Sequence, residues 1–159
     1  MKTRSWRSFV YLTGGFGLIA SIYAGLESVD AGLRGSCTIS SFFSCSAVDV
    51  SGKTSTLGIP DAAIGIAGFI LILLVAALAE RNSRDLRYLY ALLFFTTGGV
   101  GFASYFAYVE LGEIHALCPV CTAAYFFGVL VWAGAIGLTL KVRRRLLRKA
   151  GATPSGDAA

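Results

Sequence analysis

Long uncharged stretches alternate with short polar segments along this chain. Four runs carry no charged side chain, and they are Ser8–Leu26, Ala62–Ala79, Tyr88–Val109 and Ala116–Leu140. Each run reaches the roughly 18–20 residues that a helix needs to cross a hydrocarbon core of about 30 Å. The pattern predicts four transmembrane helices, over approximately residues 8–26, 60–79, 88–109 and 117–140. The predicted fold is an all-α membrane protein, a four-transmembrane-helix bundle with a long non-cytoplasmic loop that caps the helix ends.

Composition supports a membrane protein rather than a soluble domain. Hydrophobic residues make up 55% of the 159 residues and charged residues 14%, whereas a typical soluble domain has about 25% charged residues. We expect a single membrane domain over residues 1–150. The small and polar residues of 151–159 predict a disordered cytoplasmic tail.

The basic residues predict how the chain crosses the membrane. Of the 14 Lys and Arg residues, three precede the first run, three lie between the second and third runs, and six follow the fourth, which leaves only Arg34 and Lys53 elsewhere. Because cytoplasmic segments are enriched in Lys and Arg, both termini are expected in the cytoplasm. The net charge of +5 then reflects topology and contact with the lipid bilayer, and we expect no nucleic-acid partner.

The longest polar segment, Glu27–Ile59, falls on the opposite, outer side of the membrane, as does the short loop Glu110–His115. Connections longer than about 12–15 residues are usually functional or disordered. Within the long loop, the stretch "CTISSFFSCSAVDV" at 37–50 has aromatic and aliphatic residues that are expected to pack over the helix ends. Glycines recur inside the runs, where small residues let helices approach closely, although one or two could instead make room for a flat ligand.

All four cysteines fall on the predicted outer side. Cys37 and Cys45 lie in the long loop, and Cys118 and Cys121 lie at the start of the fourth span, in "HALCPVCTAAYF" at 115–126. The outer side of a cell membrane is an oxidising compartment, so thiol–disulfide chemistry is possible there. An even number of cysteines confined to one side indicates that they form pairs.

The "CPVC" stretch predicts two different sulfur environments. Proline is favoured at the first helical position, so Pro119 places Cys118 at the helix N-cap and Cys121 one turn inside. The helix N-terminus favours a thiolate. We expect Cys118 to be reachable from the aqueous side and Cys121 to face the membrane interior, where it would meet a membrane-soluble oxidant.

Two alternatives to redox chemistry remain. Permanent Cys37–Cys45 and Cys118–Cys121 disulfides could staple the outer surface of a non-enzymatic membrane scaffold, although the tiny loop closed by a Cys-x-x-Cys bond contributes little stability. The four cysteines and His115 could also bind zinc, but Cys37 and Cys45 lack the tight spacing that is usual in structural zinc sites. The pattern favours redox activity, with no metal.

The order of these motifs resembles the vitamin K epoxide reductase (VKOR) family over roughly residues 8–140. The shared features are the loop pair Cys37-x7-Cys45, Ser51 beyond it, "GIPDAAIG" at 58–65, and "CPVC" followed by Tyr125. DsbB-type oxidases also have four helices and two cysteine pairs, but in the reverse order. The resemblance implies an oxidoreductase in a prokaryotic cell membrane that supports disulfide bond formation, oxidising thiols with a quinone of the menaquinone, ubiquinone or phylloquinone type.

The resemblance also implies a role for each cysteine. A reduced thioredoxin-fold partner, similar to DsbA, would attack the Cys37–Cys45 disulfide, with Cys37 facing the partner. Cys45 would then contact Cys118 and reduce the Cys118–Cys121 disulfide. Cys121 would pass the electrons to the quinone.

Four further residues are candidates for quinone binding. Tyr125 matches the tyrosine of the family's quinone pocket, and the alternative is an interfacial tyrosine. Asp61 takes the place of an asparagine that binds the quinone in animal members, or it only caps the helix after Pro60. Phe42 and Phe43 could close over the quinone or pack against the helix ends. Where the animal members read Thr-Tyr-Ala, this chain reads Ala124-Tyr125-Phe126, so the resemblance does not extend to their sensitivity to anticoagulant inhibitors. His115 has no assigned role.

Overall fold

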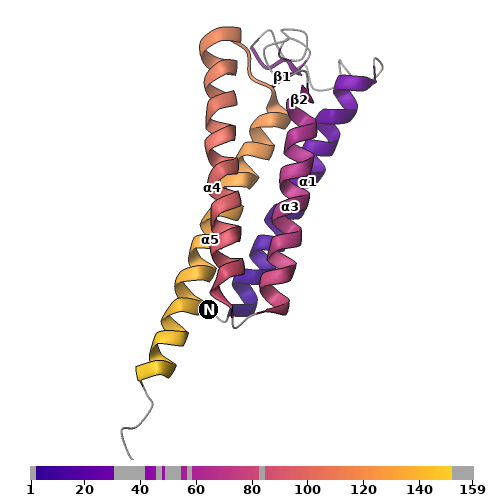
Figure 1. The fold of residues 1–159 in the computed structure, drawn as a ribbon. Helices are drawn as coiled ribbons and strands as arrows, with labels where there is room; N and C mark the ends of the chain where they lie inside the picture. The colour runs from indigo at the N-terminus through magenta and orange to yellow at the C-terminus, as the bar shows by residue number, and fades with distance from the viewer. Residues whose placement is uncertain are drawn as a thin grey trace, which may run out of the picture.

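The computed structural model describes residues 3–30, 42–45, 48, 55–56, 59–82 and 85–151. Four long helices stand side by side in this part of the chain (Figure 1). The elements are α1 (Thr3–Val29), β1 (Ser55–Thr56), β2 (Ile59–Pro60), α3 (Asp61–Arg81), α4 (Leu86–Val109), the π-helix η1 (Glu110–Ile114) and α5 (Pro119–Gly151). The two short strands pair antiparallel above the start of α3.

The helices coincide with the uncharged runs because, in lipid, a helix satisfies every backbone polar group within the segment itself. All four are long and apolar enough to cross a membrane, so the predicted four-helix membrane bundle is confirmed. Several helix ends differ from the prediction, and α1 already begins at Thr3 and ends at Val29. Helix α5 begins at Pro119 and continues to Gly151, and the predicted outer loop 110–115 is mostly the π-helix η1. The predicted disordered tail lies, beyond Gly151, outside the described residues.

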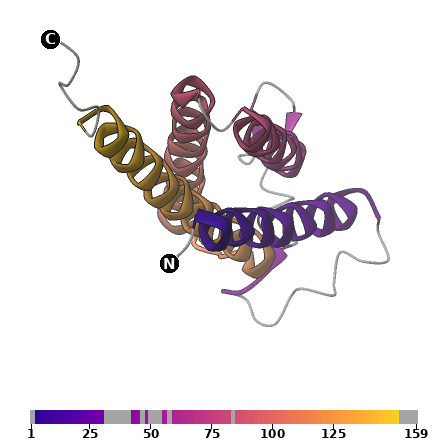
Figure 2. The same cartoon turned by 90° about the horizontal axis from the view of Figure 1, so that it is seen from below.

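Helix α1 packs against both α5 and α3, and α4 packs against the same two helices from the other side. In Figure 2, which views the bundle from below, α1 lies next to α5, and α3 and α4 lie on the opposite side of α1 from the N-terminal label. A core of buried side chains joins all four helices. Its members are Val10 of α1, Phe69, Ile72, Val75 and Ala76 of α3, Leu92 of α4, and Val131 and Ala135 of α5.

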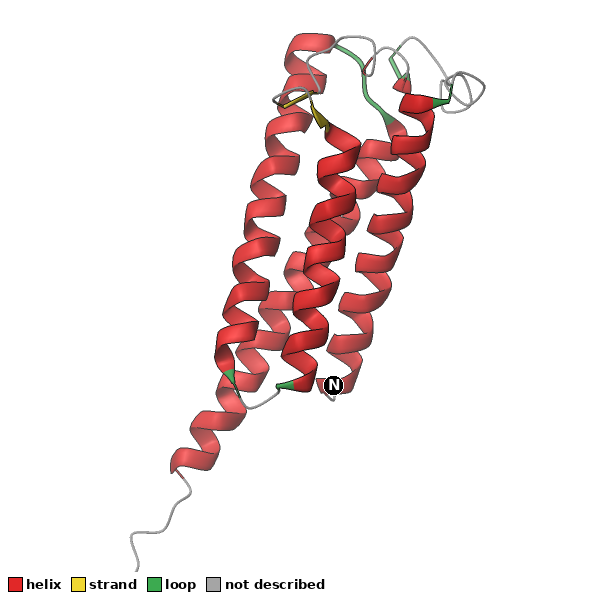
Figure 3. Cartoon of the chain, turned by 45° about the vertical axis from the view of Figure 1, so that its right-hand side comes forward, coloured by secondary structure: helices red, strands yellow, loops and turns green. Residues whose placement is uncertain are grey.

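The two ends of the bundle are chemically different. The N-terminus of α1, the C-terminus of α3, the N-terminus of α4 and the C-terminus of α5 meet at one end, beyond which α5 projects (Figure 3). This basic end carries Arg7, Arg81, Arg87 and the arginines at the end of α5. The opposite end, which we call the cysteine end, carries Cys45, Cys118, η1 and the two strands. The two kinds of chemistry therefore lie a full membrane-spanning length apart.

Glycines on α1 and α5 make close helix packing possible. A Cβ atom added at Gly17 would lie 2.3 Å from two ring atoms of Phe69, and one added at Gly137 would lie 2.5 Å from Trp6. On α4, by contrast, a Cβ at Gly98 or Gly99 would meet nothing within 4 Å. Close packing is thus the role of one group of glycines, and the other group leaves open space beside α4.

Candidate functional site

Cys118 occupies the N-cap of α5, as the sequence predicted. Pro119 is the first helical residue, and the Cys118 carbonyl accepts the first intrahelical hydrogen bond, from the Thr122 N–H at 2.9 Å. The Cys121 N–H donates to Cys118 Sγ at 3.2 Å. A side-chain acceptor bonded to an N–H in the first turn is the usual N-cap arrangement. The sulfur therefore accepts a hydrogen bond from the first-turn backbone of α5.

A short backbone pairing brings the long loop onto this helix start. The Leu117 N–H donates to the Phe42 carbonyl at 2.7 Å, and the Ser44 N–H donates to the Leu117 carbonyl at 3.0 Å. This pairing carries the next residue, Cys45, to Cys118, and their sulfur atoms lie 3.1 Å apart. That separation is longer than the roughly 2.05 Å of a disulfide and falls in the about 3–3.5 Å range of reacting atoms poised for attack.

The sulfurs differ in bonding and in exposure. Cys45 is disulfide-bonded, whereas Cys118 and Cys121 are free thiols. Cys118 is only 3% exposed, because Cys45, Val48 and Ala116 pack around it. The expectation that Cys118 faces the aqueous side is therefore wrong for this structure, since the loop covers it. The predicted Cys37 lies outside the described residues.

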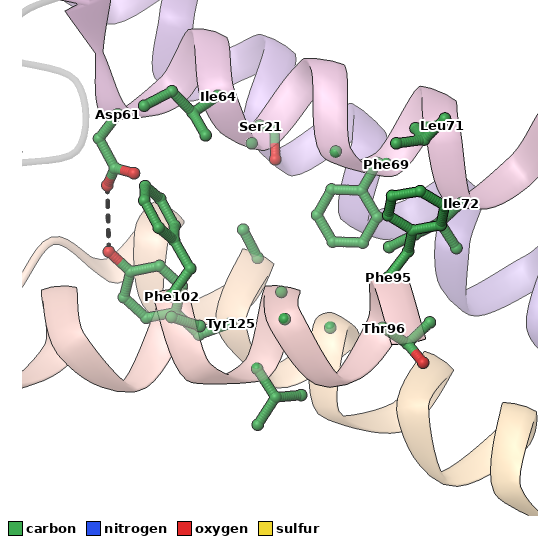
Figure 4. Close-up of a pocket in the computed structure, with 18 of the residues that line it drawn as sticks. Ser21, Asp61, Ile64, Phe69, Leu71, Ile72, Phe95, Thr96, Phe102 and Tyr125 are labelled. Carbon is green, nitrogen blue, oxygen red and sulfur yellow. Dashed lines mark hydrogen bonds between the residues drawn. The ribbon is translucent and has the colours of Figure 1, made fainter. Parts of the chain in front are cut away.

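A cavity of about 320 Å³ opens between the four helices next to Cys121, within the roughly 300–1,000 Å³ that is usual for small-molecule sites. Figure 4 shows its apolar part, which Phe69, Leu71, Ile72 and Phe95 line. Cys121 lines the cavity and Cys118 does not. The pair therefore has one sulfur against the loop and the other against the cavity.

Polar groups of the cavity are concentrated at its cysteine end. Ser21 and Thr96 also line the cavity, but their hydroxyls donate to carbonyls of their own helices, at 3.0 Å to Gly17 and 2.8 Å to Leu92. Tyr125 and Asp61, which face each other in Figure 4, are joined by a 3.3 Å hydrogen bond from the tyrosine hydroxyl to Asp61 Oδ2. The cavity thus offers an apolar slot with hydrogen-bonding groups at one end.

Asp61 is not the N-cap of α3, because that position is Pro60 and no side chain makes a capping hydrogen bond there. It is the first residue of α3, where an acidic side chain suits the helix dipole. Its carboxyl group also lines the cavity and accepts from Tyr125. The structure thus shows Asp61 bonded to Tyr125 at the cavity rather than capping the helix.

Glu110 is the member of the site that the sequence analysis missed. Its side chain is fully buried, at 0% exposure. Glu110 Oε1 accepts from the Tyr125 hydroxyl at 2.9 Å, and Oε2 accepts from the Cys118 N–H at 3.2 Å. In the sequence, an acidic residue that follows an apolar run resembles a loop residue. The π-helical turn η1, a feature frequent at functional sites, instead directs the Glu110 side chain toward Tyr125 and Cys118.

Other predicted residues lie away from the cavity. Phe42 and Phe43 do not line it, because the backbone pairing with Leu117 holds them at the surface, where their rings pack edge to face at a centroid distance of 5.2 Å. They are 45% and 43% exposed. His115 is exposed and has a left-handed backbone with φ of 56°. Among the described residues, no group of three or more His, Cys, Asp or Glu side chains is placed to hold a metal ion.

Comparison with protein families agrees with this arrangement. The profile of the vitamin K epoxide reductase family matches residues 8–136. The chain belongs to the vitamin K epoxide reductase family. None of the curated proteins compared with this VKOR chain matches it. Membership implies a membrane thiol–disulfide oxidoreductase associated with quinones, and the matched segment contains every residue of the site described above.

Proposed function

We propose that this VKOR-family protein is a membrane thiol oxidase that passes electrons from a reduced thioredoxin-fold partner to a membrane quinone. The partner dithiol reduces the loop disulfide of Cys37 and Cys45 and leaves as a disulfide. The loop dithiol then reduces the Cys118–Cys121 disulfide by exchange. Finally, the Cys118–Cys121 dithiol gives two electrons and two protons to the quinone, which leaves as quinol. Each step moves one electron pair, so one new disulfide in the partner matches one quinol.

The observation that carries this proposal is the order of the sulfur atoms. Cys45 Sγ lies 3.1 Å from Cys118 Sγ, and Cys121, one helical turn further on, lines the cavity. Exchange between Cys45 and Cys118 needs little movement, because the attacking and attacked atoms are already in contact. The N-cap position of Cys118 favours the thiolate that attacks or leaves in that exchange.

The cavity suits a quinone ring as the electron acceptor. A quinone is flat and apolar with a carbonyl oxygen at each end, and the cavity has an apolar slot with Tyr125 and Asp61 at one end. In this role the Tyr125 hydroxyl donates to a quinone oxygen and stabilises the negative charge that develops as electrons arrive. Phe42 and Phe43, which lie at the surface, are left out of the quinone site.

The basic end of the bundle supports a cytoplasmic position for both termini, by the enrichment of Lys and Arg in cytoplasmic segments. The cysteine end would then face an oxidising compartment outside a prokaryotic cell membrane, where a DsbA-like partner oxidises its substrates. The alternative function, a scaffold stapled by disulfides, is less well supported because Cys118 and Cys121 are free thiols.

The proposal is tested by turnover of the purified protein in lipid nanodiscs. Supplied with a reduced thioredoxin-fold protein and a menaquinone or ubiquinone analogue, the parent should form quinol in step with partner disulfide. Cys118→Ser and Cys121→Ser should each abolish turnover, and Cys45→Ser should block transfer from the partner. The lipid-facing Ser104→Ala is the control and should turn over normally. Quinol formation by all three cysteine variants at the parent rate would overturn the proposal.

A further inference from the structure

Glu110 is an unusual residue for a membrane bundle, because its carboxyl group is completely buried without a cation. Among the described residues no Lys or Arg pairs with it, and the ion pair in that part of the chain, Arg7–Glu80, lies at the basic end. Burying a carboxyl group is costly unless hydrogen bonds compensate. Ionisable residues at membrane depth are rare and usually take part in function.

The two contacts of the Tyr125 hydroxyl favour an extra proton in this cluster. Its hydroxyl lies 2.9 Å from Glu110 Oε1 and 3.3 Å from Asp61 Oδ2, yet a phenol has only one proton to donate. Both contacts are ordinary two-centre hydrogen bonds only when one of the two carboxyl groups is protonated and donates to the phenol oxygen; otherwise the single phenol proton is shared between two acceptors and both bonds are weaker. The fully hydrogen-bonded form of the cluster is the one that holds a carboxyl proton beside the phenol proton.

The backbone around Glu110 connects this cluster to the cysteines. The Glu110 carbonyl accepts from the Ala116 N–H at 3.3 Å, and its side chain accepts from the Cys118 N–H at 3.2 Å. One residue thus touches both the peptide that holds Cys118 in place and the hydroxyl that faces the cavity.

We propose that Glu110 supplies one of the two protons of quinol formation, acting through the Tyr125 hydroxyl. This inference rests on the proposed function. As the quinone accepts the electron pair, Tyr125 gives its proton to a quinone oxygen and takes the proton of the Glu110 carboxyl group. The Cys118–Cys121 dithiol releases two protons on forming its disulfide. One of them returns Glu110 to its protonated form and the other completes the quinol, so that protons and electrons balance.

Two half-reactions separate this role from mere support of Cys118. The first is exchange between Cys45 and Cys118, followed without quinone by the rate at which Cys118 and Cys121 become free to react with an alkylating reagent after a reduced partner is mixed with the oxidised protein. The second is quinol formation after the reduced protein is mixed with quinone. Glu110→Gln keeps the side-chain shape and an oxygen for the Cys118 N–H but cannot carry the proton. Its matched control is Glu113→Gln, one turn away and exposed.

We expect Glu110→Gln to slow the quinol half-reaction by at least about 100-fold, the usual lower range for a lost acid–base group. Thiol exchange should stay within about threefold of the parent, and Glu113→Gln should leave both rates unchanged. Glu110→Asp, which retains an acid, should recover at least tenfold of the lost quinol rate. Equal slowing of both half-reactions would show a structural role and overturn the inference.

The proposed function and this inference fail in different ways. A parent protein that forms no quinol overturns the proposed function and the inference together. A parent that forms quinol, with Glu110→Gln forming it at the same rate, overturns the inference alone. If Glu110→Gln does not fold, as judged by gel filtration in detergent, Glu110→Asp decides. Failure of Glu110→Asp to form quinol faster than a fully inactive cysteine variant would then count against the inference.

Discussion

Removal of the Tyr125 hydroxyl is the most informative single change at the cavity. Tyr125→Phe keeps the ring and deletes only the group that lies 2.9 Å from Glu110 and 3.3 Å from Asp61. A hydrogen bond to a charged group contributes about 1.5–3 kcal/mol. If the hydroxyl stabilises the charge that develops on the quinone, its loss should slow quinol formation roughly 10- to 150-fold, at about 1.4 kcal/mol for each factor of ten. Thiol exchange should not change, because the hydroxyl bonds to neither Cys45 nor Cys118.

The assay mixes pre-reduced protein with quinone in a stopped-flow instrument and follows quinol by its ultraviolet absorbance. Tyr105→Phe is the matched control, because Tyr105 is also on a membrane helix but is 59% exposed and does not line the cavity. It should behave as the parent does. A Tyr125→Phe rate within threefold of the parent, with Tyr105→Phe equally unaffected, would refute the assignment of Tyr125 as the hydrogen-bond donor to the quinone.

Three other changes test the packing, the cavity and the topology. Gly17→Ala should lower the free energy of unfolding by about 1–3 kcal/mol, because its Cβ would meet Phe69 at 2.3 Å. Gly15→Ala is the control, since its Cβ would meet nothing within 4 Å, and thermal melts in detergent compare the two variants. Gly99→Leu should raise the KM for quinone by filling the cavity, whereas Gly101→Leu, outside the lining, should not; equal KM values would contradict the cavity assignment. A reporter enzyme that works only in the cytoplasm should be active when it is fused to the C-terminus. Activity of a reporter that works only outside the cytoplasm would contradict the predicted topology.

The sequence predicted the helices well because their pattern is local. Each uncharged run is long enough to span a membrane by itself, and the structure has a helix at each one. The N-cap position of Cys118 was predictable for the same reason, since it depends only on the adjacent Pro119. The family resemblance also rested on short motifs in a fixed order, and the family profile confirms it.

Features that depend on contacts between distant segments were not predictable. Glu110 reads as a loop residue until the π-helix turns it toward Tyr125 and Cys118. The burial of Cys118 depends on the pairing of residues 42–44 with Leu117, so the exposure of Cys118 predicted from the sequence was too high. The same pairing holds Phe42 and Phe43 away from the cavity. Among the glycines, only the packed helices distinguish Gly17, which faces an aromatic ring, from Gly99, which faces open space.

The most direct test of the relay is to trap its internal exchange. In Cys121→Ser, the thiolate of Cys118 attacks Cys45 and releases Cys37 as a thiol, and Cys121 is no longer present to release the mixed disulfide by closing a Cys118–Cys121 bond. Alkylation of the freed Cys37 prevents the reverse exchange. The protein is quenched with an alkylating reagent, digested without reduction and analysed by mass spectrometry. The relay predicts a Cys45–Cys118 cross-link as the main species, an alkylated Cys37, and no such cross-link in Cys118→Ser. A main cross-link between Cys37 and Cys118, or a fully alkylated Cys118, would contradict it.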